Sequence, residues 1–156
     1  MQAATLSEIK RELKTRDAEE ILQLCLRLGR FKKDNKELLT YLLFEAEDEA
    51  TYITSIKNEI DEVMKELNVH TLYFAKNGLR KILRNLTKNI RYSGNKQTEV
   101  ELLLHFCQAM KASTIEIDRS VQLQNLFDRQ VQKIHKALTG LHEDLQADYQ
   151  YEIDRL

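Results

Sequence analysis

The chain has 156 residues, a formal net charge of -1, and a composition of 42% hydrophobic and 31% charged residues. This balance is typical of a folded globular or helix-rich protein and excludes a disordered chain. No apolar run approaches the roughly 20 residues that a membrane-spanning helix needs, and the N-terminal residues lack the basic-then-apolar pattern of a secretory signal. We therefore expect a soluble, cytoplasmic protein that does not contact a membrane.

The sequence contains no proline and only four glycines. Because proline breaks helix interiors but is common in loops, its absence indicates long helices joined by short turns. Apolar residues recur at spacings of three and four along almost the whole chain, which is the helical period. We predict a single all-α domain over residues 1–156, with about seven helices arranged as antiparallel hairpins in a short HEAT-like solenoid or a helical bundle.

Three short helices are predicted at the N-terminus. The first follows the capping-box spacing of Thr5 and Glu8. The second begins near Asp17 and ends at Gly29, since glycine is the usual left-handed C-terminal residue. The third is capped by Asp34. The apolar residues expected to form the inner faces of these helices are Leu6, Ile9, Leu13, Ile21, Leu22, Leu24, Cys25, Leu28, Leu38, Leu39, Leu42 and Leu43.

Three longer helices are expected in the middle of the chain. An apolar seam from Ala46 to Leu67 predicts one, and a seam from Leu72 to Ile90 predicts the next, which breaks or kinks at Asn77–Gly78 and ends before Gly94. Residues 95–112 predict another, built on Val100, Leu103, Leu104, Cys107 and Met110.

The C-terminal segment of about 115–156 predicts one long helix, or two helices that meet at Gly140. The two cysteines, Cys25 and Cys107, lie in apolar runs and form no CxxC pair. We expect both to be buried, reduced thiols.

Charge is strongly segregated along the chain, although the total is nearly neutral. The net charge is +3 over residues 1–36, -7 over 37–75, +6 over 76–114 and -3 over 115–156. Residues 76–96 carry seven Lys or Arg and no Asp or Glu. On a helix, these cations lie opposite the apolar arc, so they form an exposed basic stripe.

Like charges at i,i+4 spacing cost about 0.2 to 0.5 kcal/mol per pair, so an anionic neighbour would stabilise the stripe. Three neighbours fit: the acidic side chains of the preceding helix (Asp48, Glu59, Glu62 and Glu66), another protein chain, or phosphate. The candidate anion-binding or partner-binding residues are Lys76, Arg80, Arg84, Lys88, Arg91 and Lys96 in the stripe, with Arg30, Lys32, Lys33 and Lys36 nearer the N-terminus.

A short sequence echo links these two groups. Arg30–Phe31 followed by Asn35–Lys36 resembles Arg91–Tyr92 followed by Asn95–Lys96, at an offset of about 60 residues. If this is a structural repeat, both basic turns lie on one edge and form a composite basic rim of the kind that binds nucleic-acid backbones. The alternative is a chance match between two amphipathic segments.

Catalytic and metal-binding motifs are absent from the sequence. It contains no phosphate-binding glycine loop, GxSxG, HExxH or ExxH motif. Glu101 and His105 are one helical turn apart, and His135 and His142 are two turns apart, but edge histidines are the common outcome of such spacing. We predict no catalytic residue, metal, cofactor or small-molecule substrate; a deep polar cleft lined by His105 or His135 would instead indicate an enzyme.

These patterns favour a non-enzymatic helical interaction module. Such a scaffold or adaptor would bind a protein partner or a second copy of itself. The alternative is a nucleic-acid-binding helical repeat protein that uses the basic rim.

Overall fold

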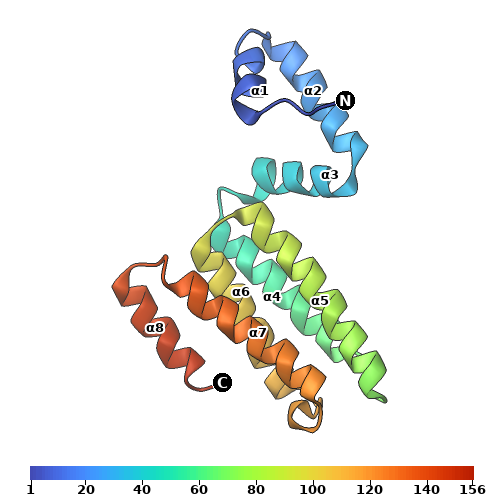
Figure 1. Cartoon of the computed structure of the whole chain (residues 1–156), viewed down its shortest axis with the longest axis vertical. Coiled ribbons are helices and arrows are strands. Elements are labelled where there is room, and N and C mark those ends of the chain that lie inside the picture. Colours follow the sequence, from blue (N-terminus) through green and yellow to red (C-terminus); the bar gives the residue numbers. More distant parts are fainter. The chain divides into compact units, whose positions relative to one another are not determined.

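Helices make up all of the regular structure in the computed structural model, which describes residues 1–156 (Figure 1). There are eight α-helices, a π-helical turn at Tyr41–Glu45, a 3-10 turn at Ile117–Arg119, and no strand. The all-α prediction of about seven helices is therefore confirmed, and no helix is long and apolar enough to cross a membrane. The helices are α1 (Leu6–Leu13), α2 (Ala18–Phe31), α3 (Lys33–Thr40), α4 (Glu49–Lys65), α5 (Leu72–Ser93), α6 (Lys96–Ala112), α7 (Val121–Leu138) and α8 (Glu143–Ile153).

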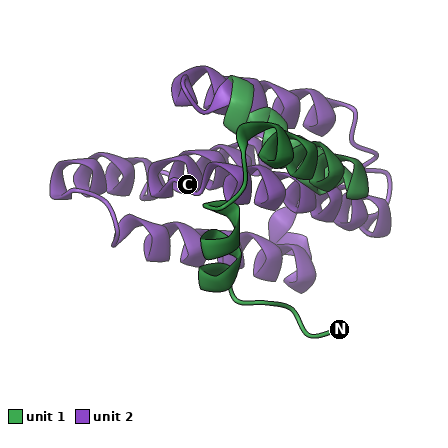
Figure 2. Ribbon diagram, turned by 90° about the horizontal axis from the view of Figure 1, so that it is seen from above, with its two compact units in different colours: residues 1–44 green, residues 45–156 purple.

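The chain divides into two compact units, Met1–Phe44 and Glu45–Leu156 (Figure 2). The first unit contains α1 to α3, and the second contains α4 to α8. A single domain over residues 1–156 stays a prediction. The same division into two units would result from two subdomains of one domain or from two separate domains.

The second unit is a helical bundle built around α6, which contacts α4, α5 and α7 (Figure 1). A helix that is apolar around most of its circumference must be covered there, and α6 meets this description outside a polar strip that includes Glu101 and His105. Its buried residues are Thr98, Val100, Leu102, Leu103, Leu104, Phe106, Cys107 and Met110. The predicted core of this helix omitted Leu102 and Phe106, both of which are fully buried.

Helix α5 is continuous through Asn77–Gly78, so the predicted break is wrong. Gly78 serves packing instead: a Cβ atom at this position would lie 2.0 Å from Cδ1 of Leu67. The predicted end of the helix is confirmed, because Gly94 adopts the left-handed conformation with φ of 65°. Asn95 then caps α6 at once, which makes α5 and α6 an antiparallel hairpin.

The C-terminal segment follows the two-helix alternative. Helix α7 ends at Leu138, and α8 begins at Glu143 after a turn that contains Gly140. The imidazole of His142 caps α8 by accepting a hydrogen bond from the backbone N–H of Asp144.

The caps of the first unit are partly as predicted. Thr5 and Asp17 both form complete capping boxes at the starts of α1 and α2. The predicted end of α2 at Gly29 is wrong, because Gly29 stays helical beneath Leu39 of α3 and the helix continues to Phe31. The predicted cap at Asp34 is also wrong: α3 follows Lys32 without a side-chain cap.

The first unit has almost no core of its own. None of the residues in α1, α2 or α3 is buried. The apolar residues predicted to face inward are exposed or half-exposed, and Tyr41 is the single buried residue of positions 1–44. A segment as short as residues 1–44 rarely buries enough apolar surface to be stable alone. The exposed apolar sides of its three helices agree with this limit.

The two cysteines therefore differ in environment. Cys107 is fully buried in α6, and burial raises the pKa of its thiol to about 12. Cys25 is only half-buried. The predicted burial is confirmed for Cys107, while for Cys25 it is wrong, because α1 and α3 cover α2 only in part. That both thiols are reduced stays a prediction.

Candidate interaction surfaces

The basic stripe lies on the exposed side of α5, opposite the buried residues Ala75, Leu79, Ile82 and Leu86. Arg80, Arg84 and Arg91 are exposed and form no ion pair within the second unit. Their positions at i, i+4 and i+11 place the three guanidinium groups along one line of the helix. They form the unpaired part of the stripe.

The other predicted cations, Lys76 and Lys88 on α5 and Lys96 at the start of α6, are in contact with the rest of the second unit. The ammonium of Lys76 donates a hydrogen bond of 2.6 Å to the side chain of Gln122 on α7. Lys96 pairs with Glu99 at 2.7 Å, and Lys88 is half-buried. These residues are therefore held more firmly than the three arginines.

The four acidic residues predicted to face the stripe form no ion pair with Arg80, Arg84 or Arg91. Asp48 caps α4 through Thr51, whose hydrogen bonds lower the pKa of the Asp48 carboxyl. Glu62 pairs with Lys65 at 2.6 Å. Glu59 accepts only a long hydrogen bond of 3.4 Å from Asn85, and neither it nor Glu66 forms an ion pair with α5. Which of the three predicted neighbours the stripe meets stays a prediction.

The other predicted basic residues lie at the junction of α2 and α3 in the first unit. Arg30, Lys32, Lys33 and Lys36 are all exposed, and Lys33 pairs with Glu37 at 3.3 Å. The composite rim that would join them to the α5 stripe stays a prediction.

Two exposed aromatic rings begin α5. The rings of Tyr73 and Phe74 meet edge to face, with centroids 5.6 Å apart and planes at 74°. Both are at least half-exposed, and Tyr73 lies seven residues before Arg80, on the same side of the helix. The exposed face of α5 thus combines aromatic rings with unpaired cations.

An apolar groove runs between α1 and α2 in the first unit, with a volume of about 710 Å³. Ile9 and Leu13 from α1 and Leu24 from α2 provide its apolar floor. Its rim is acidic. Five of the unit's seven acidic side chains line the groove (Glu8, Glu12, Asp17, Glu19 and Glu20), but only two of its nine basic ones, Arg16 and Arg27. Net charge by segment does not reveal this groove, because the segment is basic overall while its acidic side chains gather around the groove.

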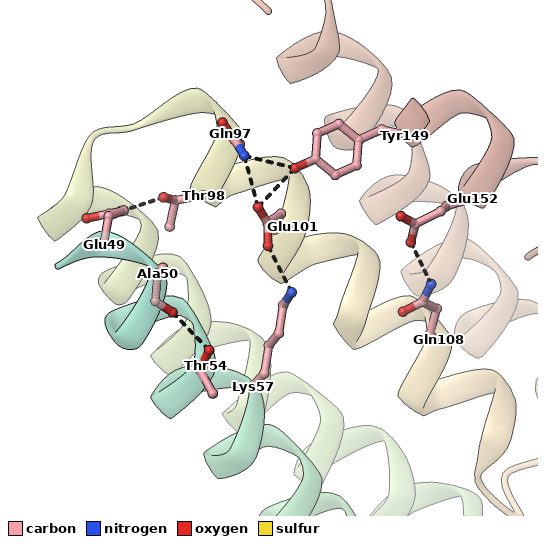
Figure 3. A network of polar contacts seen from close by, with 10 residues as sticks. All are labelled: Glu49, Ala50, Thr54, Lys57, Gln97, Thr98, Glu101, Gln108, Tyr149 and Glu152. Carbon is pink, nitrogen blue, oxygen red and sulfur yellow. Dashed lines mark hydrogen bonds and ion pairs between the residues drawn. The ribbon is translucent and has the colours of Figure 1, made fainter. Parts of the chain in front are cut away.

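A polar network ties α6 to α4 and α8. Figure 3 shows Lys57 from α4 and Tyr149 from α8 converging on the carboxylate of Glu101. Lys57 Nζ lies 2.9 Å from Glu101 Oε2, and the Tyr149 hydroxyl donates to Oε1 at 2.9 Å. Gln97 donates to both Glu101 and Tyr149. One carboxylate therefore connects three helices.

The ionisation of this network follows from its contacts. Burial by itself raises the pKa of Glu101, but the hydrogen bonds from its three partners and the charge of Lys57 outweigh burial and hold that pKa below the usual 4.5. Burial and the neighbouring Glu101 carboxylate raise the pKa of Tyr149 to about 12. At neutral pH the pair is an ionised carboxylate and a neutral phenol.

Three further contacts join α4 to its neighbours, two to α6 through Thr98 and His105 and one to α5 through Ser93. Glu49 accepts hydrogen bonds from Thr98 and Ser93, and His105 Nε2 lies 2.7 Å from Asp61 Oδ1. No group of three or more His, Cys, Asp or Glu side chains could hold a metal ion.

A polar cavity of about 330 Å³ opens between α4 and α6 and is lined in part by Lys57, Gln97 and Glu101. Neither His105 nor His135 lines it. No protein family, curated protein or solved structure matches the chain.

Glu101→Gln should lower the free energy of unfolding of the second unit by about 1 kcal/mol at pH 7, because it removes a hydrogen-bonded, partly exposed charge. The folded-state pKa of Glu101 is lowered, so its stabilisation is present above the unfolded pKa and is lost as pH falls through the folded value. Denaturant unfolding from pH 7 to pH 3 should therefore show the two proteins converging. Glu66→Gln, at an exposed carboxylate outside the network, is the control. A gap independent of pH would contradict this account.

Proposed function

We propose that the chain is a non-enzymatic helical interaction module whose first unit docks a protein partner. The second unit acts as the stable scaffold that carries it. The observation that supports this proposal most strongly is the unburied apolar surface of α1 to α3.

The exposed apolar residues of the first unit are numerous for its size. Thirteen of positions 6–44 are exposed large hydrophobic residues: Leu6, Ile9, Leu13, Ile21, Leu22, Leu24, Leu26, Leu28, Phe31, Leu38, Leu42, Leu43 and Phe44. Isolated apolar residues are normal on any surface, but contiguous groups mark binding sites for proteins or membranes. Their helical spacing favours a protein, because a partner helix can pack its side chains between them.

The second unit has the properties expected of a scaffold that stays folded while the first unit binds partners. It has its own core, centred on α6, and the Glu101 network joins its helices. A unit of this kind can stay folded while the first unit exchanges partners.

A photoreactive phenylalanine analogue at Phe31 tests the docking role in the cells that make the protein. Phe31 is 76% exposed in the first unit, and Tyr151 is 65% exposed in the second. We expect the probe at position 31 to give a discrete cross-linked species, identified by mass spectrometry, and the same probe at position 151 to give none.

Light scattering of the purified chain then distinguishes a second copy of the chain from a different protein as the partner. If the probe cross-links to a second copy, the purified chain should also be a dimer. Absence of cross-links at position 31 and at a second exposed site, Leu43, would contradict the proposal.

A second candidate function is nucleic-acid binding by the α5 face. Its specific support is that Arg80, Arg84 and Arg91 are exposed without ion pairs in their unit and that Tyr73 and Phe74 are exposed at the start of the same helix. Arginine lines contact phosphates, and exposed aromatic rings stack bases.

Under this second function, Arg80→Glu combined with Arg84→Glu should weaken binding to a single-stranded oligonucleotide by at least about tenfold at low salt. The slope of log affinity against log salt should also fall by about 1.4, since each phosphate contact contributes about 0.7. Fluorescence anisotropy across a salt series measures both quantities. Lys133→Glu with Lys136→Glu on α7 makes the same change in net charge and should leave binding unchanged. Equal losses in the two variants would exclude the α5 face as the site.

A further inference from the structure

We propose that the groove between α1 and α2 is a docking site for an amphipathic helix of a different protein, with Lys or Arg flanking its apolar stripe. This inference rests on the proposed function and specifies the partner's chemistry.

The shape of the groove suits a helix. Ile9 and Leu13 are one turn apart on α1, and Leu24 faces the groove from α2. The eight residues of α1 span about 12 Å at 1.5 Å per residue, which is a little over two helical turns. A guest helix of that length would present apolar residues at i, i+3, i+4 and i+7 and would complete a three-helix packing arrangement.

The charge of the rim selects the guest. The first unit has more basic than acidic side chains, yet five of its seven carboxylates and only two of its nine cations line the groove. The apolar floor is therefore bordered by negative charge, while the rest of the unit is basic. Complementary potentials favour a cationic partner and disfavour an anionic one.

Two of the rim carboxylates are fixed in place before any partner binds. Glu8 accepts hydrogen bonds of 2.8 Å from both the backbone N–H and the hydroxyl of Thr5, and these bonds lower the pKa of Glu8. Glu20 accepts from the backbone N–H of Asp17 at 3.2 Å and pairs with Arg16 at 3.3 Å. These two side chains are held in place before binding, so little of their conformational freedom is lost when a partner binds.

Two modes of self-association are disfavoured. Two such grooves placed face to face would bring carboxylates against carboxylates. The basic helix α5 cannot enter either, because its apolar side is buried within its own unit by Leu79, Ile82 and Leu86. We therefore assign the groove to a helix from another protein, and the oligomeric state of the chain tests the remaining modes of self-association.

The test uses the full chain and three labelled synthetic peptides of 16 residues. One has a Leu stripe at i, i+3, i+4 and i+7 flanked by Lys, the second has the same stripe flanked by Glu, and the third has the Lys composition with the stripe scrambled. Fluorescence anisotropy at low ionic strength should show the Lys peptide binding at least about tenfold more tightly than either of the others.

Matched variants locate the site. Leu24→Asn changes the groove floor, whereas Leu28→Asn changes a leucine one turn away on the same helix that does not line it; Leu24 is 43% exposed and Leu28 58%. Binding of the Lys peptide should fall at least tenfold in the first variant and stay unchanged in the second. Glu12→Lys with Glu19→Lys should reverse the preference between the Lys and Glu peptides.

Equal effects of Leu24→Asn and Leu28→Asn, or no preference for the Lys peptide, would overturn the groove as the site. A dimer in light scattering that Leu24→Asn dissociates would also overturn it, in favour of a second copy. The proposed function is tested separately. Cross-links at Phe31 without peptide binding in the groove would contradict the groove but support the interaction module. Absence of cross-links would contradict the interaction module itself.

Discussion

The structure depends on one constraint, which is that α6 is apolar around most of its circumference and must be covered there. The consecutive residues Leu102, Leu103 and Leu104 are all buried, although each points about 100° away from the one before it around the helix. Covering them requires α4, α5 and α7 together. The one polar strip of α6, which includes Glu101 and His105, is satisfied by Lys57 and Asp61 of α4 and by Tyr149 of α8. The packing of α6 therefore uses most of the second unit.

The first unit has no comparable central element. Its three helices are amphipathic, but none of them encloses the others, and their apolar sides remain exposed. Contact of this apolar surface with water is unfavourable, so covering it with a binding partner would lower the free energy. The capping boxes at Thr5 and Asp17 explain how α1 and α2 keep their helical form without a core, since they satisfy backbone N–H groups locally.

The sequence predicts helix positions well because caps and periodicity are local. Thr5, Asp17, Gly94 and Asn95 all mark helix ends as expected. Burial is harder to predict, because it depends on neighbours that a periodic pattern does not encode: α2 and α4 have similar apolar seams, yet only α4 is covered. The burial of α6 around most of its circumference had a visible signal in the consecutive residues Leu102 to Leu104. The acidic groove also had one, since Glu8 and Glu12 flank Ile9 and Leu13, but net charges over segments concealed it.

The most direct test of this account is native-state hydrogen exchange of the free chain, read by mass spectrometry over peptides from α1, α2 and α6. If stability resides in the packing around α6, its amides should exchange only when the second unit unfolds. Amides of α1 and α2 should then exchange at least about a hundredfold faster, which corresponds to about 3 kcal/mol. Protection of α1 and α2 equal to that of α6 would contradict the account, because it would mean that the first unit already has a stable core.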